Sequence, residues 1–146
     1  MQCRPIASSD LSRVSCWNRQ LQLDEGAEPM ELDAIRARLE RWLGEGYEGL
    51  IFESDSQPVG YALFRATDPD LKEPDGLYLR QFFVLRKHRR CGFGTRAFRL
   101  FQNDVLGERR LVLEALASNP DGRAFWQSLG LTPYSVTFEL KPDAAT

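Results

Sequence analysis

The strongest constraint on the fold is a strand–turn–helix unit in the second half of the chain. Residues 77–85 form a strongly apolar segment, which is typical of a central strand covered on both faces of a sheet. A basic turn with two glycines follows, and residues 92–106 carry apolar side chains at helical spacing. A buried strand that leads into an amphipathic helix requires a layered architecture in which helices cover a sheet.

The rest of the chain extends this α/β pattern. Strands are predicted at residues 3–6, 49–53, 59–66, 111–116 and 134–140, and further helices from Leu11, over residues 32–43 and over residues 119–130. Asn119 is a good helix N-cap, Pro120 suits the first helical position, and Gly130 suits the left-handed position after the helix. Residues 55–58 predict a hairpin turn and residues 68–76 a loop. The predicted order is βααβββαβαβ, a single α/β domain over residues 1–146.

Composition excludes several classes of function. No apolar run approaches the ~20 residues that span a membrane, and no secretory signal is present, so a cytoplasmic location is expected. A net charge of −2 argues against a general nucleic-acid binder. Cys3, Cys16 and Cys91 show no C-x-x-C spacing and His88 is the single histidine, which together argue against a metal site.

The basic turn has the features of an anion-binding site. Six Lys or Arg residues and no acid lie between Arg86 and Arg99. A helix N-terminus presents unpaired N–H groups and a partial positive charge, glycines allow close approach of the backbone, and arginines add bidentate donors. A polyphosphate ligand therefore fits residues 89–95 on physical grounds.

A dinucleotide is a second interpretation of that ligand. Gly92, Gly94 and Ala97 also satisfy G-x-G-x-x-[GA], the dinucleotide pattern, and Glu114 follows at about the expected distance. Against it, seven residues separate Val84 from Gly92, five of them basic with His88 counted, and little chain remains for a nicotinamide-binding sheet. A triphosphate P-loop is excluded because no Gly-Lys-[Ser/Thr] occurs.

At this turn the sequence resembles the GNAT superfamily of N-acetyltransferases. The family signature [Q/R]-x-x-G-x-[G/A] matches Arg89-x-x-Gly92-x-Gly94. A second family motif, N-x-x-A-x-x-x-Y-x-x-x-G-[F/L], matches at Asn119, Gly130 and Leu131, with Gly122 in place of the alanine and Trp126 in place of the tyrosine. Both motifs stand on the expected elements in the expected order.

The resemblance implies a mixed, mostly antiparallel sheet flanked by helices, with a splayed pair of parallel strands in the middle, residues 77–85 and 111–116. Acetyl-CoA is then the co-substrate, with no metal; its pantetheine would lie between those strands and its pyrophosphate at the turn. An N–H near Phe83 or Val84 would face the thioester oxygen. The cofactor-binding residues implied are Phe83, Val84, Leu85, Arg89, Arg90, Cys91, Gly92, Phe93, Gly94, Thr95, Asn119, Phe125 and Trp126.

The implied reaction is acetyl transfer to a primary amine of a small molecule or peptide, by direct attack through a tetrahedral intermediate. An alkylammonium with a pKa of ~10 must first lose a proton. Glu114 stands where ribosomal-protein N-terminal acetyltransferases of the superfamily carry a similar base, although it could instead pair with an arginine. At the position of Trp126 many members of the superfamily have a tyrosine, which is proposed to protonate the departing CoA thiolate. In this chain Tyr134, Tyr78 or water could protonate the thiolate instead. We favour a third alternative, in which a thiolate with a pKa of ~8.5 leaves without an acid.

The partners follow from the same resemblance. The acceptor site would lie over the first two helices and the loop between them, roughly residues 19–32, where Glu25, Glu28 and Glu31 would suit a cationic amine or simply form a solvated face. The absence of the tyrosine favours an alternative function, a non-catalytic acyl-CoA-binding regulatory module. An exposed last strand could pair two copies as a homodimer; no nucleic-acid or membrane partner is expected.

Overall fold

Within the described residues, five strands form one sheet in the order β1-β2-β3-β4-β5, antiparallel except for the last pair. The computed structural model describes residues 1–67, 76–89 and 91–142. The strands are β1 (Gln2–Pro5), β2 (Glu48–Ser54), β3 (Gln57–Ala66), β4 (Leu77–Val84) and β5 (Leu111–Leu113). The helices are α1 (Leu11–Asp24), α2 (Leu32–Gly44), α3 (Phe93–Phe101) and α4 (Pro120–Ser128). The predicted mixed α/β fold is confirmed.

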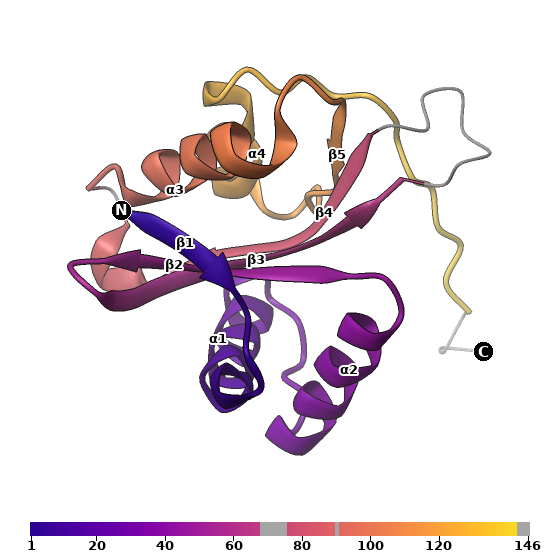
Figure 1. Cartoon of the computed structure of the whole chain (residues 1–146). Helices are drawn as coiled ribbons and strands as arrows, with labels where there is room; N and C mark the ends of the chain where they lie inside the picture. The colour runs from indigo at the N-terminus through magenta and orange to yellow at the C-terminus, as the bar shows by residue number, and fades with distance from the viewer. Residues whose placement is uncertain (68–75, 90, 143–146) are drawn as a thin grey trace.

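Helices cover both faces of the sheet, α1 and α2 on one side and α3 and α4 on the other (Figure 1). Strand β3 shows why the sheet must be covered twice. Ala62 and Phe64 join the core beneath α3 and α4, whereas Tyr61 and Leu63 join the core beneath α1 and α2. Successive side chains of a strand point to opposite faces, so an apolar run of this kind is stable only between two layers of helices.

Local signals set several element boundaries as predicted. The turn between β2 and β3 consists of Asp55 and Ser56, both with positive φ, which is the conformation that suits the twist of a tight hairpin. Asn119 caps α4 by accepting a hydrogen bond from the Gly122 N–H at 3.1 Å. Gly130 has a φ of +97° just after that helix. Helix α3 begins at the predicted turn and continues into a wider turn at Gln102–Leu106.

The prediction of a last strand at residues 134–140 is wrong. This segment is extended but pairs with no strand in the described part of the chain, and Tyr134, Val136, Phe138 and Leu140 are 76–98% exposed. A strand exists only through its neighbour, and β5 offers just three residues. For the same reason the parallel pair of β4 and β5 lies at the edge of the sheet rather than in its middle.

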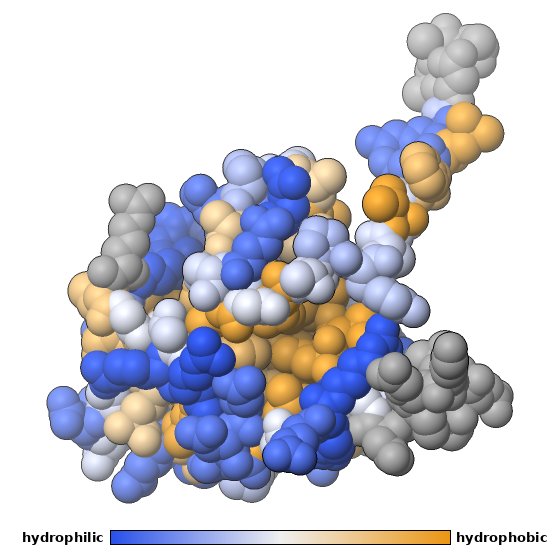
Figure 2. Space-filling view, turned by 90° about the horizontal axis from the view of Figure 1, so that it is seen from above, coloured by the Kyte–Doolittle hydropathy of each residue, from blue (hydrophilic) through white to orange (hydrophobic). Residues whose placement is uncertain are grey.

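An apolar hollow opens on the face seen from above, and residues beyond α4 leave the body as an arm that stands clear of it (Figure 2). The loop predicted at residues 68–76 lies almost wholly outside the described residues. Among the helices that are described, none has both the length and the apolar character needed to cross a membrane.

Candidate acyl-CoA site and adjoining pocket

The N-terminus of α3 presents free backbone donors. The first hydrogen bond of the helix runs from the Arg96 N–H to the Gly92 carbonyl at 3.0 Å, so the N–H groups of Phe93, Gly94 and Thr95 have no partner within the helix. No side chain of the described residues caps this end. Three adjacent N–H groups at a positive helix end form a site for an anion.

Two glycines shape this turn for different reasons. Gly92 has a φ of +79°, a left-handed conformation that any other residue adopts at a cost. A Cβ at Gly94 would lie 3.2 Å from the ring of Phe125, so the glycine lets α3 and α4 pack closely. Cys91 and Thr95 are exposed beside the turn, and Arg90, also predicted to bind the cofactor, lies outside the described residues.

The arginines of the turn are less free than the sequence suggested. Arg89 donates from Nε to the Val84 carbonyl at 2.8 Å and pairs with Asp24 at 2.8 Å. Arg86 also pairs with Asp24, at the end of α1. Burial raises the pKa of Asp24, but the hydrogen bonds from Arg86 and Arg89 outweigh it and hold that pKa below its ordinary value. Arg89 thus fixes the turn against α1, and Asp24 is the structural residue with which both arginines pair.

Strands β4 and β5 separate after a short paired stretch. The parallel ladder joins Leu77–Leu79 to Leu111–Leu113, and β4 then runs on to Val84 with no neighbouring strand on that side among the described residues. The Leu85 N–H bonds the Val59 carbonyl of β3 at 2.8 Å, so it is not available to a ligand. Because successive residues of a strand direct their N–H groups to opposite edges, the N–H of Val84 points to the open edge.

The second predicted group of cofactor residues lies on α4. Phe125 stacks on Phe82 with ring centroids 6.1 Å apart, and Trp126 meets Phe82 and Phe98 edge-to-face at 5.4 and 5.6 Å. These contacts explain how a tryptophan fits at this position: its partly buried ring packs against the core beneath α3. The side-chain oxygen of Asn119 is occupied by the hydrogen bond that caps α4.

The two predicted catalytic residues have different surroundings. Glu114 follows β5, is exposed, and accepts a hydrogen bond from the Tyr78 hydroxyl at 3.3 Å. Burial and the nearby Glu114 carboxylate raise the pKa of Tyr78. Tyr134 is 80% exposed, with the Arg110 guanidinium 4.6 Å from its ring centroid. The structure therefore brings Glu114 to Tyr78, and places Tyr134 on the exposed arm.

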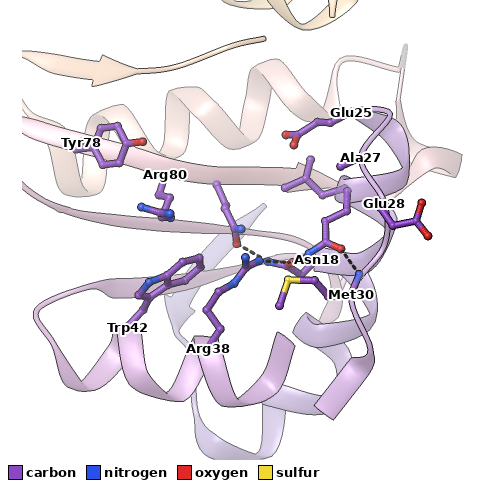
Figure 3. Close-up of a pocket in the computed structure, with 12 residues that line it drawn as sticks. Asn18, Glu25, Ala27, Glu28, Met30, Arg38, Trp42, Tyr78 and Arg80 are labelled. Atoms are coloured by element: carbon purple, nitrogen blue, oxygen red, sulfur yellow. Dashed lines mark hydrogen bonds between the residues drawn. The ribbon is translucent and has the colours of Figure 1, made fainter. Parts of the chain in front are cut away.

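A pocket of about 340 Å³ lies between β4, α1, α2 and the loop that joins the two helices (Figure 3). Tyr78, Arg80 and Gln81 line it from β4, close to where pairing with β5 stops. Of the three glutamates predicted to form an acceptor site, Glu25 and Glu28 line the pocket and Glu31 does not. Desolvation and the adjacent Asp24 raise the pKa of Glu25.

A hydrogen-bonded cluster forms the floor of this pocket. The fully buried Asn18 donates from Nδ2 to Gln81 Oε1 at 2.6 Å, and the buried Tyr61 hydroxyl donates to the same oxygen at 2.8 Å. Gln22 links Asn18 to the Met30 N–H, which orders the loop between the helices. With its side-chain oxygen accepting two hydrogen bonds, Gln81 has its amide N–H groups left to donate.

The sequence analysis missed the cationic side of the pocket. Arg38 and Arg80 place their guanidinium carbons 4.5 and 4.2 Å from the Trp42 ring centroid. Trp42 and Arg38 come from α2 and Arg80 from β4, so the group exists only in the folded chain (Figure 3). The sequence signal was weak: each arginine has one buried apolar neighbour in the chain, Leu39 beside Arg38 and Leu79 beside Arg80.

Comparisons with known proteins agree with this geometry. The family model of the acetyltransferase (GNAT) family matches residues 14–131. A possible acetyltransferase from Clostridium difficile 630 superposes with a TM-score of 0.80 at 16% identity, over 97% of this chain and 96% of that one. The aminoglycoside 6'-N-acetyltransferase AAC(6')-IG from Acinetobacter haemolyticus gives 0.68 at 18% identity, over 98% and 100% of the chains. The aminoglycoside N-acetyltransferase AAC(6')-Iy in complex with CoA gives 0.71 at 18%, over 98% and 95%. No curated protein sequence matches.

Proposed function

The chain belongs to the GNAT acetyltransferase family, and from that premise we propose that it transfers an acetyl group from acetyl-CoA to a primary amine. One observation carries the proposal: the open edge of β4 leads into the uncapped N-terminus of α3. This gives a row of backbone donors for the amides of pantetheine, followed by a cluster of donors for the pyrophosphate. The CoA complex of the AAC(6')-Iy neighbour supports an acyl-CoA ligand for this fold.

The cofactor residues take the following roles in the proposal. The N–H of Val84 faces the thioester oxygen, where it would stabilise the oxyanion of the tetrahedral intermediate. Phe83 packs in the core beneath α1 and α2 and holds β4 in place, and the N–H of Leu85 bonds the Val59 carbonyl of β3. Arg89 braces the turn, whereas Phe125 and Trp126 form an apolar wall beside the cofactor. The pyrophosphate is bound by the N–H groups at the start of α3, from Gly92, Phe93, Gly94 and Thr95, next to Arg90 and Cys91.

Glu114 is the proposed base. Its exposed carboxylate would accept the proton of the acceptor ammonium through water in the pocket and the Tyr78 hydroxyl, since Tyr78 both touches Glu114 and lines the pocket. The neutral amine then attacks the thioester carbonyl, its nitrogen releases the second proton to water, and the intermediate collapses by breaking the C–S bond. A CoA thiolate with a pKa of ~8.5 needs no acid to leave. The role of Tyr134 as that acid stays a prediction.

A thiol-release assay tests the proposal. Purified protein is incubated with acetyl-CoA and a panel of primary amines, and free CoA is followed with a thiol reagent while acetyl-CoA affinity is measured by calorimetry. We expect binding and acceptor-dependent release of CoA. No binding of acetyl-CoA would refute the proposal.

One observation favours a second candidate, an acyl-CoA-binding module without catalysis. The position where relatives place a phenol is occupied by Trp126, whose ring is packed between Phe82 and Phe98. Indole N–H is no practical acid at neutral pH. Tight acetyl-CoA binding without turnover on any acceptor would support the module.

The proposal has two further parts. Three free thiols, Cys3, Cys16 and Cys91, fit a reducing compartment, and with acetyl-CoA as co-substrate we place the protein in the cytoplasm. We also propose a homodimer. The exposed arm alternates apolar and polar side chains, and Leu111 and Leu113 of β5 are only partly buried. In the part of the chain that the structure describes, β5 also has an unpaired edge. A second copy supplies both a matching edge and a matching arm.

A further inference from the structure

The pocket holds two guanidinium groups without a carboxylate partner among the described residues. Arg38 donates from Nη2 to Asn18 Oδ1 at 3.2 Å, and its Nε is buried with no hydrogen-bond partner. Arg80 donates from Nη1 to the Tyr47 hydroxyl at 3.1 Å. By contrast, Arg4, Arg36, Arg86 and Arg89 all form ion pairs with Asp or Glu.

The surroundings of Arg38 disfavour its positive charge. Burial lowers the pKa of Arg38, and the positive charge of Arg80 lowers it further. Both groups lie against the one Trp42 ring, which offsets only part of the cost of bringing two cations together. Like charges gathered in a pocket are typical of a site whose ligand supplies the opposite charge.

The other end of the pocket is acidic. Glu25 and Glu28 stand on the loop after α1, away from Arg38, Trp42 and Arg80 (Figure 3). Glu25 forms no ion pair among the described residues. Desolvation and the nearby Asp24 raise its pKa. The pocket therefore has two poles, and a ligand that satisfies both must itself carry a positive and a negative group.

We propose, on the basis of the proposed acetyl transfer, that the acceptor is a small amphoteric amine whose anionic group binds Arg38 and Arg80 while its ammonium lies beside Glu25. The side-chain amide of Gln81 adds a neutral N–H donor for the anionic group of the acceptor. A pocket of about 340 Å³ is at the small end of the range for ligand sites, which suits an amino acid or a phosphorylated amine. A polyamine or an aminoglycoside would place further positive charge against the two arginines.

Matched acceptors separate these classes. Lysine, lysinamide and cadaverine share a side-chain amine and differ in the carboxylate; phosphoethanolamine and ethanolamine differ in a phosphate. We expect kcat/KM to be at least about tenfold higher for the anionic member of one set, because a charged hydrogen bond contributes that much. The set that shows the difference identifies the anion. Equal rates within both sets, or faster transfer to spermidine, would overturn the inference.

Arginine variants test whether Arg38 and Arg80 cause the preference for an anionic acceptor. Arg80→Gln and Arg38→Gln should each raise KM about tenfold for the anionic acceptor, with little change for its neutral partner and none in the KM for acetyl-CoA. Arg38→Lys should recover part of the loss. Arg41→Gln, on the exposed part of α2, is the control. Equal losses on anionic and neutral acceptors would show that the arginines only support the fold, and would contradict the inference.

The result also distinguishes the two proposals. If acetyl-CoA is bound and consumed but neutral amines are equal acceptors, acetyl transfer stands and the amphoteric acceptor is wrong. If no acceptor in any set releases CoA, both are wrong. A thermal shift with the anionic acceptor alone, lost in Arg80→Gln and kept in Arg41→Gln, would support the site independently of turnover.

Discussion

At Gly92 the backbone has a positive φ and open space around the Cα, so a side chain there meets conformational strain but no steric clash. Gly107 has the same two properties, with a φ of +62°, and lies beyond the other end of α3. The two glycines therefore separate the effect of the backbone from the effect of the anion-binding turn.

Gly92→Glu should weaken acetyl-CoA binding by at least about tenfold, because a carboxylate would occupy the positive helix end. Gly107→Glu carries the same charge at a more strained position, with a ψ of −135° against 3° at Gly92, and should leave the affinity of the folded protein within about twofold. Isothermal titration calorimetry of both variants gives the comparison. Equal affinities would exclude the α3 turn as the phosphate site.

Glu114→Gln should lower kcat by about a hundredfold near neutral pH, the low end of the range for a general base. The deficit should shrink as the pH approaches the ammonium pKa of ~10, where the free amine forms unaided. Glu108→Gln, another exposed glutamate before β5, is the control. A deficit that does not change with pH would show that Glu114 has a structural role.

At the scale of elements, Asp24 joins three parts of the fold. It ends α1 and pairs with Arg86 and Arg89, which lie between β4 and α3. Its side chain is only 18% exposed, whereas the arginines are 63% and 37% exposed. Solvent screening of the arginines limits the stabilisation to about 1 kcal/mol.

Asp24→Asn should therefore lower the free energy of unfolding by about 1 kcal/mol at neutral pH. Because the pKa of Asp24 is lower in the folded state, its ionised carboxylate stabilises the fold at any pH above the unfolded pKa of ~3.9. This stabilisation is lost as the pH falls through the folded-state pKa. The difference between wild type and variant should thus vanish in acid. Urea unfolding from about pH 7 to about pH 3 measures it, with Asp55→Asn as the control. A constant difference would contradict this account.

At the scale of the whole molecule, the exposed arm is the feature that the monomer does not explain. Its apolar side chains alternate with polar ones, as in a strand with one buried face. The edge of β5 is the matching unpaired surface.

The homodimer should be disrupted by charge on the apolar side of the arm. Val136→Glu with Phe138→Glu should convert a dimer into a monomer, whereas Ser135→Glu with Thr137→Glu places the same charge on the polar side and should preserve it. Sedimentation velocity measures both. A monomeric wild type would rule out the homodimer.

Local patterns in the sequence determined most of the elements of this protein. Asn119, Pro120 and Gly130 bound α4, Asp55 and Ser56 make the β2–β3 turn, and the apolar run at residues 77–84 becomes a strand covered on both faces, because capping, turn chemistry and side-chain periodicity act over a few residues. The glycine turn was predicted for the same reason.

Tertiary structure alone decided the rest. Arg38, Trp42 and Arg80 form the cationic end of the pocket although they lie on separate elements, and Asp24 became the partner of Arg86 and Arg89 only when α1 packed beside β4. Residues 134–140 have the pattern of a strand but pair with no strand in the residues that the structure describes. Pairing, charge compensation and pocket shape depend on which distant residues meet, and one-dimensional periodicity does not contain that information.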